Sequence, residues 1–200
     1  MPTHGAPANT ELPAAMTFVQ ETLQALRGIG AILVGRRDAY RHFDLSLAGL
    51  AGSMAAFFIA LLINGYMPFL INASEDMGPA WQNIVLALLL FGLQVGFAAL
   101  VLRQFGRMDG LVPYLVADNW ATLFMTILSL ALALLNIQSD ILVLPLGILI
   151  LIVEINIARL IVTLSGWQIA AFLIAQFAAV VVGLMAFGTL FPGAAVVVTG

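Results

Sequence analysis

The sequence predicts an all-α fold, a polytopic membrane bundle of five transmembrane helices preceded by an amphipathic interfacial helix. The prediction rests on composition, on five long apolar stretches and on the placement of arginine. Of the 200 residues, 62% are hydrophobic and 8% are charged, and the mean hydropathy is +1.10. Because a soluble domain carries about 25% charged residues, this deficit indicates that most of the protein surface faces lipid.

Each apolar stretch is long enough to cross a hydrocarbon core of roughly 30 Å. Turn-forming segments separate the stretches, for example Gln138-Ser139-Asp140 and Ser165-Gly166. We therefore expect a transmembrane domain over residues 46–200. Its five spans are expected at residues 46–71, 80–102, 112–136, 141–164 and 167–191.

Arginine placement predicts the orientation of these spans. All seven basic residues are arginines, at positions 27, 36, 37, 41, 103, 107 and 159. With a cytoplasmic N-terminus and a periplasmic C-terminus, all seven lie on the cytoplasmic side, as the positive-inside rule requires. A lysine-free composition rich in Arg, Ala and Leu is typical of a GC-rich bacterium, which favours a multi-pass protein of the bacterial inner (cytoplasmic) membrane.

Two segments are expected before the first span. Residues 1–13, rich in Pro, Ala and Thr, are expected to form a disordered tail. Residues 14–45 are expected to form a cytoplasmic amphipathic segment, because apolar side chains recur there at helical spacing. This helix either lies on the membrane, where anionic headgroups hold nearby arginines, or docks on the bundle. The apolar stripe consists of Val19, Leu23, Leu26, Ile29 or Gly30, and Leu33, and the candidate headgroup-binding residues are Arg36, Arg37 and Arg41.

Small residues in three spans predict where the helices approach one another closely, which helix packing in lipid favours. Residues 92 and 96 form a GxxxG pair in the second span. Ordinary packing within the bundle is the favoured interpretation, over a dedicated dimer interface. The candidate packing residues are Gly52, Ala56, Gly92, Gly96, Ala175, Ala179 and Gly183.

Polar side chains inside the spans are the candidates for function, since an ionisable residue at mid-depth costs at least roughly 2.5–3.5 kcal/mol. Glu154 either stays protonated or pairs with an arginine, Arg159 on the same span or Arg103 or Arg107 on another. Structural pairing is the favoured interpretation, over a proton or ion relay. The candidate polar residues are Asn64, Asp118, Asn119, Glu154 and Arg159.

No sequence motif indicates an enzyme. Cysteine is absent, no glycine-rich segment forms a nucleotide-binding motif, and the two histidines lack metal-site spacing. We expect no cofactor, no bound metal and no nucleic-acid partner. The expected function is a non-enzymatic assembly or membrane-organising component that binds lipids, other integral membrane proteins or a second copy of itself. The alternative is a small transporter or channel component that uses Glu154 and Asp118.

Two short segments resemble a known family: Phe43-Asp44-Leu45-Ser46 before the first span, and Ala117-Asp118-Asn119-Trp120 in the third. With the order of the spans, they make the chain similar to bacterial members of the YIP (Ypt/Rab-interacting protein) superfamily, of an uncharacterised alphaproteobacterial type. The resemblance implies a cytoplasmic N-terminal segment followed by five tightly packed spans. It implies no catalytic residues.

Overall fold

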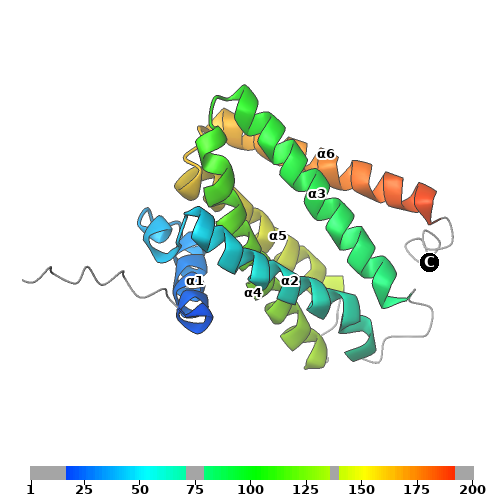
Figure 1. Ribbon diagram of the computed structural model, residues 1–200. Helices are drawn as coiled ribbons and strands as arrows, with labels where there is room; N and C mark the ends of the chain where they lie inside the picture. The colour runs from blue at the N-terminus through cyan, green and yellow to red at the C-terminus, as the bar shows by residue number, and fades with distance from the viewer. Residues whose placement is uncertain (1–16, 71–78, 136–139, 192–200) are drawn as a thin grey trace, which may run out of the picture.

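The computed structural model describes residues 17–70, 79–135 and 140–191, and in these ranges all regular structure is helical (Figure 1). Five helices are long and apolar enough to cross a membrane, with mean hydropathies between 1.5 and 2.6, so each of the five predicted apolar stretches forms a helix of sufficient length. The expected tail at residues 1–13 lies outside the described ranges. The elements are α1 (Phe18–Leu33), the 3-10 turn η1 (Ala39–His42), α2 (Leu47–Leu70), α3 (Ala80–Gln104), the 3-10 turn η2 (Met108–Gly110), α4 (Leu111–Leu134), α5 (Asp140–Asn156), the π-turn η3 (Ile157–Ile161) and α6 (Gly166–Leu190).

The helices form two packed groups. The most extensive contacts join α2 to α4 and α3 to α6, and α1 packs against α4 and α5. In Figure 1, α3 and α6 run side by side, while α2, α4 and α5 form the other group. The two groups meet chiefly where α2 contacts α3. The helices therefore form a bundle in which the α3–α6 pair packs mainly against α2, and its five long apolar helices are those expected of a multi-pass membrane protein.

The tightly packed core lies at the end of the bundle where the arginines are. Its largest fully buried side chains include Trp120, Phe172, Leu102 and Ile157, from α4, α6, α3 and η3. Toward the opposite end, large apolar side chains such as Met185 are exposed. That distribution is what a lipid-embedded bundle needs, because lipid solvates apolar side chains and burial there gains little.

Helix α1 begins at a capping box. The backbone N–H of Gln20 donates to Thr17 Oγ1 at 3.4 Å, and the backbone N–H of Thr17 donates to Gln20 Oε1 at 3.1 Å. The helix ends before Gly35, whose φ of +70° is a backbone conformation that glycine adopts without steric cost. Local sequence signals thus set both ends of this helix.

Helix α1 docks on the bundle, one of the two arrangements that the sequence left open. Ala25 and Ile29 are buried, and Gly28 lies so close to Phe43 that a Cβ there would sit 2.5 Å from Phe43 Cζ. The predicted apolar stripe docks only in part: Ile29 is buried, whereas Val19 is 66% exposed and Leu23 is 55% exposed. The helix therefore has two apolar faces, one against the bundle and one directed outward.

Candidate functional site: a carboxyl pair between two apolar helices

Two carboxyl groups meet between α4 and α5. The side chains of Asp118 and Glu154 are in hydrogen-bonding contact. Asp118 lies seven residues after Leu111, and Glu154 lies seven residues before Ile161, so the two antiparallel helices bring them to the same depth. Two carboxylates in contact repel each other unless one of them holds a proton or a cation lies between them. The pair therefore forms a site for one positive charge.

The pair opens into a cavity of about 270 Å³. A water molecule occupies roughly 30 Å³ in the liquid, so the cavity has room for several. Asn64 and Thr126 are joined across it, because Asn64 Nδ2 donates to Thr126 Oγ1 at 2.8 Å. The polar side chains that line the cavity beside the carboxyl pair are Asn64, Thr122, Thr126 and Ser129. Thr122, Thr126 and Ser129, the hydroxyl stripe of α4, therefore line the same cavity as the carboxyl pair.

Asn119, next to Asp118 in the sequence, points elsewhere and has a different role. Its side chain is fully buried, and its Nδ2 donates to Ser53 Oγ at 3.1 Å and to Met54 Sδ at 3.5 Å. These bonds join α4 to α2. Asn119 thus holds the helix that carries Asp118 without lining the cavity.

The interpretation that paired Glu154 with an arginine is wrong. In the part of the chain that the structure describes, the ion pairs are Arg36–Asp38 and Arg107–Asp109, and one carboxyl oxygen of Glu154 is buried without a hydrogen-bond partner. Arg159 is exposed and lines a different cavity, with Arg37. The π-turn η3 carries Arg159 at the end of the bundle, where the residue is exposed.

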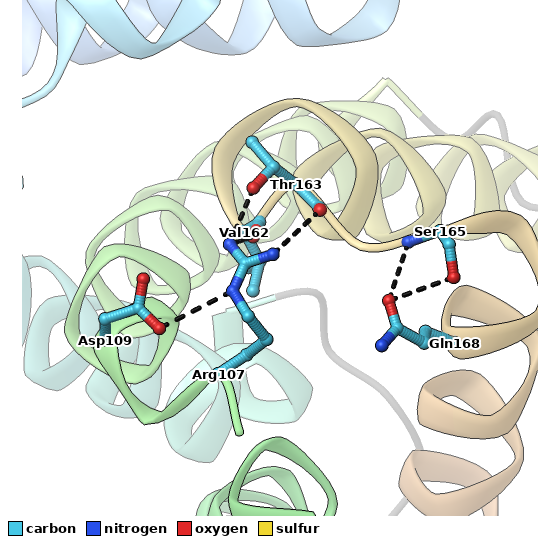
Figure 2. Close-up of polar contacts among 6 residues, drawn as sticks. All are labelled: Arg107, Asp109, Val162, Thr163, Ser165 and Gln168. Atoms are coloured by element: carbon cyan, nitrogen blue, oxygen red, sulfur yellow. Dashed lines mark hydrogen bonds and ion pairs between the residues drawn. The ribbon is translucent and has the colours of Figure 1, made fainter. Parts of the chain in front are cut away.

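Arg107, which precedes α4, binds the backbone that follows the π-turn η3 (Figure 2). Its guanidinium donates to the carbonyl oxygen of Val162 at 2.6 Å, and to the carbonyl and hydroxyl oxygens of Thr163 at 3.1 and 2.6 Å. Thr163 has a φ of +60°, a strained conformation for a threonine. Arg107 Nε also forms an ion pair with Asp109 Oδ1 at 3.5 Å. Figure 2 also shows Gln168 bound to Ser165, the capping box that starts α6.

Some of the residues predicted to pack between helices are buried, and others are exposed. Ala56 and Ala179 are fully buried, and a Cβ on Gly183 would lie 2.5 Å from Leu90 Cδ2 of α3. Gly52 adjoins the carboxylate of Glu21, and Ala175 is half-buried. Gly92 and Gly96, however, are exposed, with no side chain or other helix within 4 Å of either Cβ position, so the prediction that they pack within the bundle is wrong. Helix α3 meets α6 through its leucine face instead.

The three arginines predicted to bind lipid headgroups, Arg36, Arg37 and Arg41, differ in their contacts. The guanidinium of Arg36 is paired with Asp38 at 2.7 Å, and Arg41 Nε donates to the hydroxyl oxygen of Tyr40 at 3.3 Å. Hydrogen bonding to Asp38 raises the pKa of Arg36, and the same bond lowers the pKa of Asp38. Arg37 has neither contact and borders a cavity.

Neither a metal-binding cluster among the described residues nor a similar protein helps to assign the site. Within the described ranges, no group of three His, Cys, Asp or Glu side chains could hold a metal ion. No known protein family, curated protein or solved structure matches the chain. The likeness to the YIP superfamily stays a prediction, and function has to be argued from the carboxyl pair and its cavity.

Proposed function

We propose that this protein is a non-enzymatic small transporter or channel component that binds and passes a proton at Asp118 and Glu154. The contact between two carboxyl groups inside an apolar bundle carries the proposal. A bundle held together only by packing and neutral hydrogen bonds has no use for such a pair, since each carboxylate costs several kcal/mol to bury. Ionisable side chains placed against that cost mark proton and ion pathways in membrane proteins.

The hydroxyl stripe of α4 supports a path for the proton. From Asp118 to Ser129 the helix rises roughly 16 Å at 1.5 Å per residue, about half of a hydrocarbon core of roughly 30 Å. Thr122 and Thr126 lie between them on the same cavity wall. Water in this cavity would connect the carboxyl pair with the half of the bundle that lies farther from the arginines.

The proposed setting is the inner membrane of a bacterium, with the N-terminus in the cytoplasm and the C-terminus in the periplasm. Every arginine of the described helices and turns lies at one end of the bundle, which supports this orientation. Alkaline phosphatase fused after Gly200 should then be active and a fusion after Arg107 inactive. The reverse pattern would invert the orientation.

A second candidate is an assembly component that binds another integral membrane protein or a second copy of the chain. The open Gly92 and Gly96 face of α3 favours it, because small residues let a second helix approach closely. Gly92→Leu should abolish cross-linking of the protein in membranes to such a partner, while Gly147→Leu on α5 should leave it intact. Unchanged cross-linking of the Gly92 variant would remove this candidate.

The transport proposal is tested by proton flux in proteoliposomes that contain a pH-sensitive dye. The wild-type protein should dissipate an imposed pH gradient, and Glu154→Gln and Asp118→Asn should abolish that flux while unfolding at the parent temperature or above. Asp109→Asn is the matched control, because that carboxyl is exposed in the turn before α4. Equal flux in all four proteins, or none in the wild type, would contradict the proposal.

A further inference from the structure

A second cavity, of about 570 Å³, lies at the arginine-bearing end, where η1 meets η3. Arg37 and Tyr40 come from the segment before α2, and Arg159 comes from the π-turn. These residues are more than 100 positions apart in the sequence, so only the fold brings them together. The cavity is separate from the carboxyl pair, and the two share no lining residue.

Two uncompensated positive charges border this cavity. Among the described residues, neither Arg37 nor Arg159 takes part in an ion pair, and no acidic side chain lines the cavity. Nearby arginines are occupied, since Arg36 is paired with Asp38 and Arg107 is bound to Thr163. The cavity is therefore built for an anion.

Hydrogen-bond donors in the cavity suit a phosphate. Each guanidinium offers a planar fork of N–H groups that matches phosphate oxygens. The hydroxyl oxygen of Tyr40 accepts from Arg41 Nε, which leaves its own O–H to donate. Donors from three side chains thus line the same cavity.

Apart from Thr163, whose hydroxyl oxygen accepts from Arg107, the remaining wall of the cavity is apolar. Leu45, Leu160 and Ile161 line it, and Ile161 is the last residue of the apolar span that begins at Leu144. An apolar surface therefore continues from the cavity along α5 toward the hydrocarbon region. A free phosphate would have no use for this wall, whereas the acyl chains of a lipid would lie along it.

From these contacts we infer that the cavity binds the phosphate headgroup of an anionic phospholipid, with Arg37 and Arg159 as the principal ligands. The inference does not depend on proton binding at Asp118 and Glu154, so either can fail without the other. Lipid bound here would join the segment before α2 to the end of α5. It would hold the docked α1 region against the leaflet at this end of the bundle.

The test uses the full-length protein in mixed micelles with either phosphatidylglycerol or phosphatidylcholine, and native mass spectrometry to count retained lipids. Wild-type protein should retain phosphatidylglycerol in preference to phosphatidylcholine. Removing both arginines, in Arg37→Gln/Arg159→Gln, should weaken retention at least about tenfold, given the attraction expected per arginine. Arg103→Gln is the matched control, because Arg103 is exposed at the same end and does not line the cavity.

A second part of the test adds inorganic phosphate as a competitor of the bound lipid. Millimolar phosphate that displaces the retained lipid completely would assign the cavity to a free anion and overturn the lipid inference. Equal retention of the two lipids, or an equal loss in Arg103→Gln, would overturn the site itself. Each single variant, Arg37→Gln or Arg159→Gln, should show part of the loss at the parent unfolding temperature, which separates lost binding from lost folding.

Discussion

The side-chain Nδ2 of Asn156 donates a 2.8 Å hydrogen bond to the backbone carbonyl of Ile32, joining the last residue of α5 to the end of α1. Both partners are buried. The contact ties the N-terminal helix to the span that carries Glu154. It therefore couples the docking of α1 to the position of the carboxyl pair.

Replacing this buried amide tests the coupling. Asn156→Leu keeps the side-chain size but removes the donor, and should lower the free energy of unfolding in detergent by about 1–3 kcal/mol. Trypsin should also cleave faster after Arg27, because α1 is held less firmly. Asn83→Leu on α3 is the control, since no described residue hydrogen-bonds to the Asn83 side chain. Unchanged stability and unchanged cleavage of the Asn156 variant would show that the bond does not hold α1.

Glycine substitutions distinguish the two small-residue faces. Gly183→Leu should destabilise the protein by about 1–3 kcal/mol, because the new side chain would enter the space that Leu90 and Leu93 fill. Gly92→Leu should leave the unfolding temperature of the monomer in detergent unchanged, because that face is open. Equal losses in the two variants would mean that α3 also packs through its glycines.

Glu21 gives the stability a pH dependence of defined sign. Burial, reinforced by nearby Asp44, raises its pKa above 4.5, and the hydrogen bond with Trp120 offsets this only in part. The folded protein thus binds this proton more tightly than the unfolded chain does. Stability from this group is complete below pH 4.5 and is lost as the pH rises through the raised pKa.

The measurement is the unfolding temperature between pH 4 and pH 7. Glu21→Gln should reduce the fall in stability toward neutral pH. Asp38→Asn should leave the profile between pH 4 and pH 7 nearly unchanged, because Arg36 lowers the pKa of Asp38 and that contribution is lost only as the pH falls below 3.8. A Glu21 variant whose profile matches that of the parent would refute the assignment.

The spans could be predicted because hydropathy is a local property: the expected 46–71 and 80–102 became Leu47–Leu70 and Ala80–Gln104. Contacts between spans could not. Glu154 and Asp118 each stood out as an ionisable residue in an apolar span, but spacing along one helix does not reveal which faces meet. For the same reason, small residues on α3 and α6 did not show that Gly183 packs and Gly92 does not.

Arg107 and Thr163 were missed for a different reason. Their contact depends on the π-turn at Ile157–Ile161 and on the positive φ of Thr163, and neither feature has a hydropathy signature. The sequence offers one signal for such a cap, a basic residue in one loop and the end of a helix at another loop, and that signal is weak. The π-turn also explains why Arg159, five positions after Glu154, lies at a separate cavity.

Carbodiimide labelling tests the central claim most directly, because an apolar carbodiimide reacts with a carboxyl group that holds a proton within the bilayer. In vesicles, dicyclohexylcarbodiimide should modify Glu154 or Asp118, as identified by peptide mass spectrometry, and the modification should decline as the pH is raised. A charged, water-soluble carbodiimide should modify the exposed Asp109 in the same vesicles instead. If Asp118 and Glu154 stay unmodified by the apolar reagent at every pH while the soluble reagent still labels Asp109, the pair does not hold a proton and the account is wrong.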